Sequence, residues 1–379
     1  MEVKGCEWAA RVVALAGAGR AADDVLRETL RNARELSAED RRTISRAVFS
    51  YYRWFGWLDA QRPVRARIQH ALELAEAFAE RPKTFSNEKL VTRCLPSWIH
   101  EHADVTAAWV RALQAEPRLW LRARRGQGRT LAQRLGHCWI PGAPALSDAL
   151  EYRGEEDLFR TPEFHAGEFE IQDVGSQAVS LACDPQPGET WWDACAGEGG
   201  KTLHLSDLMA NRGLIWAGDR AEWRLRQLKR RAGRAKCFNY RTVIWDGGPQ
   251  LPTRTRFDGV LVDAPCSGVG TWQRNPHARW TTTPQDVREL AGVQQQLLER
   301  VAAAVKPGGR LVYAVCTLTR AETVEVAEAF AGRFPEFAPL TLGNPFQADR
   351  SGSQLWFLPQ DTGGSGMFVA GWKRALPRR

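Results

Sequence analysis

The fold of this chain is constrained most by a repeated pattern in its second half, where short apolar segments alternate with amphipathic helices. From about residue 169, five such segments recur, and four of them are followed within two residues by an aspartate. The five segments are Thr190–Trp192, Leu214–Ala217, Val243–Trp245, Val260–Val262 and Leu311–Val315. Strands separated by helices favour a mostly parallel sheet with helices on both faces. The pattern therefore predicts an α/β fold with a doubly wound sheet. Near the C-terminus, Leu355–Phe357 and Met367–Ala370 flank a Gly/Ser turn and predict an antiparallel pair at the edge of this sheet.

The chain before residue 169 has a different texture. Its first part carries apolar residues at helical spacing, and Ser37 followed by acidic residues is typical of a helix start. A later part combines a helix predicted from Pro96 to Leu113 with a strand over Trp120–Arg124. The sequence predicts three domains, namely an all-α domain at 1–92, a small α+β domain at 93–168 and the α/β domain at 169–379.

Charge and cysteine spacing narrow the classes of function. The formal net charge of +8 fits a polyanionic partner such as nucleic acid, although it fits a merely basic protein equally well. The eight cysteines include no Cys-x-x-Cys pair, so neither a zinc site nor a disulfide scaffold is indicated. The sequence also lacks a secretory signal and a run of 18 apolar residues. We therefore expect a cytoplasmic, monomeric protein without a metal site or a membrane span.

A glycine-rich loop follows the first predicted strand, over Cys195–Thr202. This loop is not a P-loop, because its first position is a cysteine, and it is not a dinucleotide fingerprint, because its last position is a threonine where the third glycine is needed. A nucleoside ligand without a pyrophosphate remains. Ligands of doubly wound sheets bind beyond the carboxyl ends of the strands. There, Asp219 can accept hydrogen bonds from ribose hydroxyls and Asp246 can lie near an adenine, which together predict a site for S-adenosylmethionine.

Two cysteines follow the fourth and fifth predicted strands, Cys266 in Asp263–Gly268 and Cys316 directly after Val315. Neighbouring parallel strands lie roughly 5 Å apart, so both thiols can reach one cleft. A lone cysteine is most often a small buried hydrophobe, but a pair beside a methyl-donor site suits methylation of cytosine carbon 5. A thiolate that adds to carbon 6 makes carbon 5 nucleophilic, an acid such as Asp263 can bond the ring nitrogen, and a base then removes the carbon 5 proton.

Four motifs, in this order, make the chain similar to the Nol/Nop/Sun family of RNA cytosine-5 methyltransferases, and most of all to its bacterial Sun-type members. The motifs are Ile171–Asp173 with Ser176–Gln177, Asp193–Cys195 with Gly199–Thr202, Asp263–Thr271 with Arg274–Pro276 and Trp280, and Val312–Leu318. The resemblance covers at least residues 171–372. More loosely, residues 21–61 resemble the NusB-like helical RNA-binding domain of that family.

The resemblance implies a Rossmann-like class I S-adenosylmethionine methyltransferase domain and a role for each matching residue. Cys316 matches the nucleophile, Cys266 matches the cysteine that assists product release, and Asp263 lies beside both target base and donor. The implied cofactor-binding residues are Cys195, Ala196, Gly197, Glu198, Gly199, Gly200, Lys201, Asp219, Arg220, Asp246 and Asp263. The chain departs from the family at Gly197-Glu198, where Ala-Pro is usual, and at Val315, where threonine is usual.

The implied activity is methylation of a cytosine in RNA, with ribosomal RNA of the small subunit as the first candidate. Transfer RNA is the alternative substrate within the family, and a non-catalytic RNA-binding assembly factor is the alternative outside enzymes. A DNA cytosine methyltransferase would use Cys266 as its nucleophile, and the second thiol at Cys316 argues against it. Trp280 is a candidate for lining the substrate cleft. The arginines from 118 to 129 and from 224 to 234 are candidates for phosphate contacts or for a solvated basic face.

Overall fold

The computed structural model describes residues 3–17 and 19–377, which form two compact units. The helical unit comprises residues 1–117 together with a later segment, Gly268–Asp286, and the sheet unit comprises Arg118–Ser267 and Val287–Arg379. The helical unit therefore includes a segment from the second half of the chain. The three predicted domains, with boundaries at 92/93 and 168/169, do not coincide with these units and stay predictions.

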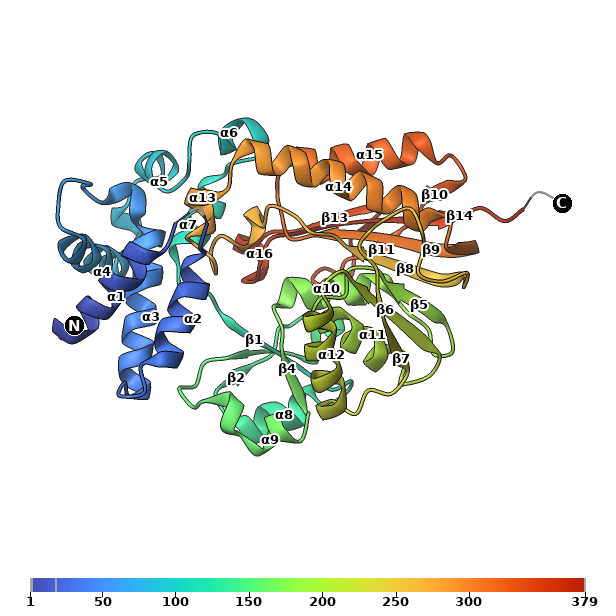
Figure 1. Ribbon diagram of the computed structural model, residues 1–379, viewed down its shortest axis with the longest axis horizontal. Coiled ribbons are helices and arrows are strands. Elements are labelled where there is room, and N and C mark those ends of the chain that lie inside the picture. The colour runs from blue at the N-terminus through green and yellow to red at the C-terminus, as the bar shows by residue number, and fades with distance from the viewer. Residues whose placement is uncertain (1–2, 18, 378–379) are drawn as a thin grey trace. The chain divides into compact units, whose positions relative to one another are not determined.

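The sheet unit is built around one large sheet with the strand order β10-β14-β9-β8-β5-β6-β7, and β13 also pairs with β14 (Figure 1). The strands β7, β6, β5, β8 and β9 are parallel to their neighbours, while β14 runs antiparallel to β9. The strands are β5 (Thr190–Asp193), β6 (Leu214–Asp219), β7 (Tyr240–Ile244), β8 (Phe257–Asp263), β9 (Val305–Val315), β10 (Phe337–Pro339), β13 (Gln354–Phe357) and β14 (Met367–Arg374). The predicted α/β class and all five predicted strands are confirmed.

The predicted C-terminal strand pair is antiparallel, with Leu355 opposite Val369, but its position at the edge was only half right. β14 lies inside the sheet, between β9 on one side and β13 and β10 on the other. Its residues 367–372 are all buried, so it reads as an apolar run rather than an alternating edge strand.

Helices cover both faces of the sheet. On one face lie α14 (Pro284–Ala302) and α15 (Val324–Arg333), and on the other lie α10 (Val174–Cys183), α11 (Gly200–Leu208) and α12 (Glu222–Arg234) (Figure 1). Successive strand residues point to opposite faces, so Trp192 packs beneath α14 and α15 while Trp191 packs beneath α10 and α11. This layering leaves the carboxyl ends of the parallel strands as the place for a ligand.

A small antiparallel sheet of order β2-β3-β1-β4 precedes the large one in the same unit. Its elements are β1 (Leu119–Ala123), α8 (Gly128–Leu135), β2 (Cys138–Trp139), β3 (Ala149–Tyr152), α9 (Pro162–His165) and β4 (Phe169–Ile171). Arg122, a candidate for phosphate contacts, is only 2% exposed and forms an ion pair with Asp207 of α11. Arg231 and Arg234 likewise pair with the buried Glu170. These three arginines join the small sheet to α11 and α12, the helices on one face of the large sheet. Two short elements, β11 (Leu342–Gly343) with β12 (Ser351–Gly352) and α16 (Pro359–Thr362), complete the unit.

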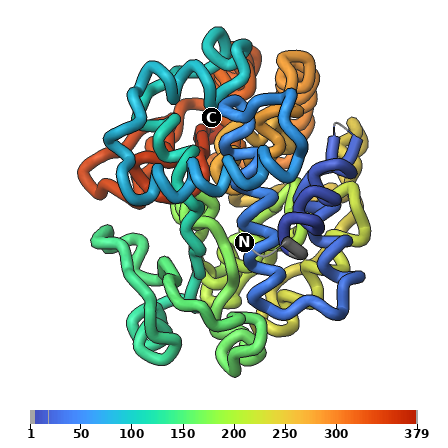
Figure 2. The backbone as a smooth tube through the Cα atoms, turned by 90° about the vertical axis from the view of Figure 1, so that its left-hand side faces the viewer, coloured from blue at the N-terminus to red at the C-terminus, as the bar shows by residue number. Residues whose placement is uncertain are grey.

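The helical unit begins with four helices that share one apolar core, shown in blue in Figure 2. Its helices are α1 (Val3–Leu15), α2 (Ala22–Asn32), α3 (Ala38–Arg53), α4 (Val64–Glu80), α5 (Asn87–Arg93), α6 (Ile99–His102), α7 (Ala107–Gln114) and α13 (Ala278–Thr281). The predicted start at Ser37 is confirmed, since Ser37 and Asp40 form a reciprocal capping box. The single helix predicted from Pro96 to Leu113 was wrong. It breaks after His102, and Thr106 caps a new helix by accepting a hydrogen bond from the Trp109 amide at 3.1 Å.

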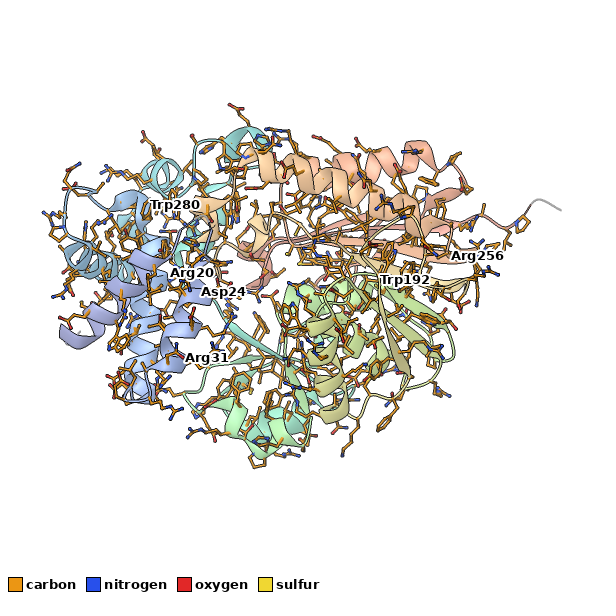
Figure 3. The ribbon with its side chains drawn as sticks, in the orientation of Figure 1. Arg20, Asp24, Arg31, Trp192, Arg256 and Trp280 are labelled. Atoms are coloured by element: carbon orange, nitrogen blue, oxygen red, sulfur yellow. The ribbon has the colours of Figure 1, made fainter. Side chains whose placement is uncertain are left out.

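The segment 268–286 is anchored in the helical unit by a buried cation. Arg279 is 0% exposed. Its guanidinium donates to the amide oxygen of Gln114 at 2.9 Å and to the backbone carbonyls of Arg53, Cys94, Leu113 and Trp272 at 3.0–3.4 Å. Trp280 also faces the helices, donating its indole N–H to the Tyr52 carbonyl at 2.7 Å (Figure 3). The Trp280 indole is partly buried against the core of the helical unit, and the expectation that Trp280 lines the substrate cleft stays a prediction.

Candidate active site

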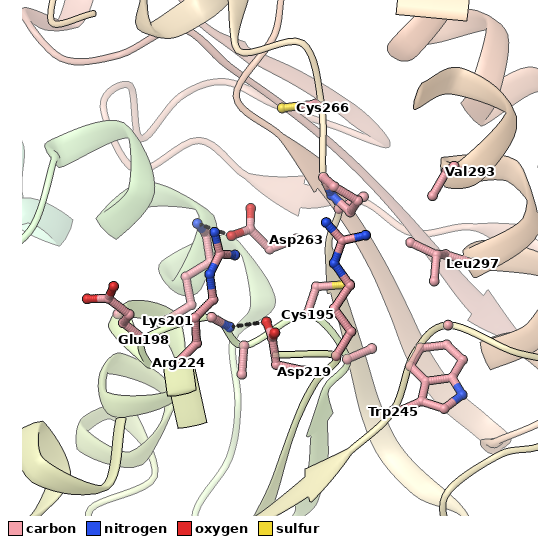
Figure 4. Close-up of a pocket in the computed structure, with 18 of the residues that line it drawn as sticks. Cys195, Glu198, Lys201, Asp219, Arg224, Trp245, Asp263, Cys266, Val293 and Leu297 are labelled. Atoms are coloured by element: carbon pink, nitrogen blue, oxygen red, sulfur yellow. Dashed lines mark hydrogen bonds and ion pairs between the residues drawn. The ribbon is translucent and has the colours of Figure 1, made fainter. Parts of the chain in front are cut away.

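A pocket of about 400 Å³ opens at the carboxyl ends of β5, β6, β8 and β9 in the sheet unit (Figure 4). The structure gathers there all three predicted catalytic residues, Cys316, Cys266 and Asp263. Ten of the eleven predicted cofactor-binding residues also line it, namely Cys195, Ala196, Gly197, Glu198, Gly200, Lys201, Asp219, Arg220, Asp246 and Asp263. The eleventh, Gly199, does not line the pocket. Its φ is +87°, and a Cβ there would lie 2.5 Å from the Leu228 side chain of α12, so only glycine fits.

The glycine-rich loop is held by the carboxylate at the end of β6. The Gly197 amide donates to Asp219 Oδ2 at 2.9 Å (Figure 4). The Ala221 amide donates to Asp219 Oδ1 at 2.8 Å. Gly197 has a φ of +54°, a left-handed conformation that glycine adopts without strain. Because each carboxylate oxygen can accept two hydrogen bonds, one acceptor position remains on each Asp219 oxygen.

A buried ion pair crosses the floor of the pocket. Lys201 Nζ donates to Asp263 Oδ2 at 2.7 Å, and Lys201 is 8% exposed (Figure 4). Burial alone would lower the pKa of the Lys201 ammonium, but the Asp263 carboxylate outweighs it and raises that pKa above its ordinary value. The Asp263 carboxylate thus favours the charged form of Lys201, and the ion pair fixes the Asp263 carboxyl at the end of β8.

The two thiols meet at the pocket. Cys266 Sγ and Cys316 Sγ lie 3.3 Å apart, because β8 and β9 are neighbouring parallel strands with Asp263 opposite Ala314. All eight cysteines lie within the described residues, and all are thiols. Cys195 also lines the pocket, but burial raises the pKa of its thiol, as it does for Cys183. A raised pKa reduces the thiolate fraction and suits a packing role.

The four strand-end aspartates do not share one role. Asp219 and Asp263 line the pocket as described, and Asp246 is an exposed lining residue whose Oδ1 accepts from the Gly248 amide at 2.7 Å. Asp193 is 1% exposed and bonds Thr202 at 2.7 Å instead of facing the pocket. Burial raises the pKa of the Asp193 carboxyl to about 7. Asp193 thus differs from the other three strand-end aspartates, which line the pocket.

Several lining residues were not predicted to belong to the cofactor pocket. Trp245, Val293 and Leu297 form an apolar side of the pocket (Figure 4). Arg224 and Ser176 add polar groups. Val293 and Leu297 are four residues apart on α14, so they share one helix face. That spacing was visible in the sequence, but nothing in it indicated that this face reaches a ligand pocket.

Residues 3–17 and 19–377 hold no group of three His, Cys, Asp or Glu side chains placed to bind a metal ion. None of the helices in the same ranges combines the length and apolar character needed to cross a membrane.

Comparison with known sequences gives one family and several relatives. Residues 180–373 match the family described as 16S rRNA methyltransferase RsmB/F. The chain is 38% identical over 227 residues to the probable ribosomal RNA small subunit methyltransferase B of Synechocystis, covering 58% of this chain and 50% of that protein. It is 30% identical over 289 residues to ribosomal RNA small subunit methyltransferase B of Salmonella typhi, which covers 73% of this chain and 65% of that protein. The chain thus spans between half and two thirds of the length of these relatives.

Comparison with solved structures supports the same fold. The crystal structure of PH0851 superposes with a TM-score of 0.80 over 99% of both chains at 23% identity. NSun6 from Pyrococcus horikoshii, solved with SFG, superposes with a TM-score of 0.61 over 70% of this chain and 93% of that one at 18% identity. At these identities the likeness concerns the fold alone.

Proposed function

Because the chain belongs to the 16S rRNA methyltransferase RsmB/F family, we propose that it transfers a methyl group from S-adenosylmethionine to carbon 5 of a cytosine in RNA. The first candidate substrate is ribosomal RNA of the small subunit, methylated in the cytoplasm by a monomer. The observation that carries the chemistry is the pair of thiols 3.3 Å apart beside the Asp263 carboxyl. A single thiol would suffice for attack, whereas a second one suits release of the product.

The pocket fits the proposed methyl donor. The two acceptor positions left on Asp219 suit the two hydroxyls of a ribose. The apolar side formed by Trp245, Val293 and Leu297 suits a purine ring. S-adenosylmethionine would supply an activated methyl group, and the relative NSun6 was solved with SFG, an analogue of it.

In this proposal the chain supplies a nucleophile, an orienting acid and a second thiol. The Cys316 thiolate adds to carbon 6 of the cytosine, which makes carbon 5 nucleophilic towards the methyl group. The Asp263 carboxyl, beside Lys201, carries the proton that the ring nitrogen takes up as the thiolate adds, and receives it back when the thiolate leaves. After methylation, a base takes the proton from carbon 5, the bond between carbon 6 and sulfur breaks, and the electron pair returns to Cys316. The short distance between the sulfurs suits Cys266 for this release, and the family resemblance assigns attack to Cys316.

Substitution of the two thiols tests this assignment. Cys316→Ala should abolish methylation and form no covalent RNA adduct. Cys266→Ala should accumulate a covalent RNA adduct that survives denaturing electrophoresis. Cys138→Ala, on β2 of the small sheet, is the matched control and should turn over normally. Methylation activity in Cys316→Ala, or a covalent adduct formed only by that variant, would contradict the proposed roles.

The substrate is tested separately. Bisulfite mapping of total RNA from cells with and without the gene should show one cytosine in small-subunit ribosomal RNA that loses its methylation. Loss of a transfer RNA site instead would identify the alternative substrate. Calorimetry with S-adenosylmethionine tests the assembly-factor alternative, since a non-catalytic protein with a decayed donor site should show no binding.

A further inference from the structure

The sheet does not hold the two thiols by itself. The last backbone hydrogen bond between the β8 and β9 segments runs from the Ala264 amide to the Ala314 carbonyl at 3.0 Å. Cys266 lies two residues beyond that bond on a loop, and Cys316 is the first residue after β9, whose pairing with β14 ends at Val315. Strand pairing brings the two sulfurs near each other, but loops move more than strands, so further interactions of the loops are needed to hold the 3.3 Å distance.

One buried side chain connects these two loops. Glu322 is 0% exposed, and its Oε1 accepts from the Ser267 amide at 2.8 Å. Its Oε2 accepts from the Ser267 hydroxyl, from Thr317 Oγ1 at 3.2 Å and from Thr319 Oγ1 at 2.8 Å. Ser267 directly follows Cys266 and Thr317 directly follows Cys316. The hydroxyls of Ser267 and Thr317 are also 2.8 Å apart.

The same carboxyl is tied to the helix layer. Gln294 of α14 is 0% exposed, and its amide donates to Glu322 Oε1 at 3.0 Å and to the Pro265 carbonyl at 2.9 Å. The Tyr313 hydroxyl lies 2.9 Å from Gln294 Oε1 and 2.7 Å from the Glu322 carbonyl. A buried network in which each polar group is bonded rigidifies its surroundings. Here it surrounds both cysteine loops.

We propose that Glu322 is a positioning residue that holds the loops of Cys266 and Cys316 in their working geometry, an inference that rests on the proposed function. Glu322 does not line the pocket, so it acts through Ser267 and Thr317. A misplacement of about 1 Å near reacting atoms can cost about 10²-fold in rate. Loss of this carboxyl should therefore reduce turnover much more than it reduces donor binding.

The test measures two quantities in each variant, the rate at which Cys266 and Cys316 form a disulfide and the kinetics of methylation. Glu322→Met keeps most of the side-chain volume and removes both acceptor oxygens. With diamide as oxidant, the two thiols give up two protons and two electrons to diamide and form a Cys266–Cys316 disulfide. Glu322→Met should slow this reaction by about tenfold or more, since the bond requires the sulfurs to approach about 2 Å at a restricted dihedral angle. Its kcat should fall by about 10²-fold while the KM for S-adenosylmethionine stays within about threefold.

Two variants separate positioning from loss of the fold. In Glu322→Gln the amide oxygen can accept from the Ser267 amide and Gln294, and the hydroxyls can turn to accept from its NH₂, so both rates should stay within about threefold of the wild type. Ser267 is partly buried. Ser267→Ala removes the hydroxyl but keeps the backbone hydrogen bond to Glu322, so it should slow both reactions about five- to tenfold. Glu325→Met, at an exposed position three residues along, is the control and should change neither rate.

The outcomes are distinct from those that test the function. Wild-type rates of disulfide formation and turnover in Glu322→Met would overturn the inference, and if that variant does not fold, wild-type rates in Ser267→Ala would overturn it. The disulfide assay contains no RNA. If the wild type failed to methylate RNA while its disulfide rate still depended on Glu322, the proposed function would fail and the positioning role would stand.

Discussion

Each of the two units buries one charged side chain completely, and the two differ in the kind of partner they gather. Arg279 in the helical unit donates mostly to backbone carbonyls, four in all. Glu322 in the sheet unit accepts mostly from side chains, two of which directly follow the thiols. A bond to the backbone fixes where the chain runs, while a bond to a side chain beside a reactive group fixes where that group points. We therefore expect Arg279 to control stability and Glu322 to control catalysis.

The largest effect on stability should come from Arg279→Met. This change leaves four carbonyls and the Gln114 amide oxygen without their donor, and removal of a buried charged partner costs about 3–5 kcal/mol. Burial lowers the pKa of the Arg279 guanidinium to about 10, which does not discharge it at neutral pH. Hydrogen exchange should show lost protection in α3, α7 and 268–286 and retained protection in β5 and β8. Arg62→Met, whose side chain is 64% exposed, is the control. Equal stabilities for the two variants would break the contrast with Glu322.

Asp193 should have a smaller, pH-dependent effect on the free energy of unfolding. It is buried with far fewer hydrogen-bond partners than Glu322. Burial raises the pKa of its carboxyl from 3.8 to about 7 in the folded state, so between these values the folded protein binds more protons than the unfolded chain. The free energy of unfolding should therefore fall as pH rises from about 4 to 7, by about 2–4 kcal/mol from this group.

Asp193→Asn should flatten that dependence, because the amide does not titrate. Denaturant unfolding at several pH values measures it, with Asp349→Asn at an exposed position as the control. A slope unchanged by Asp193→Asn would show that Asp193 is ionised in the folded protein like an exposed acid.

Thr319→Val should have the smallest effect on stability, because it removes one hydrogen-bond donor to Glu322 and leaves the others in place. The free energy of unfolding should fall by about 1–2 kcal/mol, the usual value for a hydrogen bond to a charged group. The rate of disulfide formation between Cys266 and Cys316 should stay near that of the wild type. Thr341→Val, at an exposed position, is the control. A large fall in disulfide rate would show that the Glu322 network has no redundancy.

The sequence predicted the parts of this molecule that depend on local pattern. The five parallel strands, the glycine-rich loop and the meeting of Cys266 with Cys316 follow from alternation and from the geometry of neighbouring strands. Glu322 and Arg279 could not be predicted in the same way, because their partners lie up to 55 and 226 residues away and only the folded chain brings them together. The burial of Asp193 away from the pocket could not be predicted for a related reason. The position of a residue at a strand end does not determine whether its side chain faces the pocket or the core.

The path of the segment 268–286 has a consequence for synthesis. Residues 1–117 leave the ribosome well before this segment, which completes the helical unit with Trp272, Arg279 and Trp280. At about 5–20 residues per second, the early helices wait roughly 10–30 s for it. During that time their apolar core is unfinished, and the chain is open to aggregation or to chaperone binding. Deleting the N-terminal helices would create the opposite fault, since the fully buried Trp272 and Arg279 would lose the core that encloses them. The helical unit thus cannot be trimmed off as a separate module.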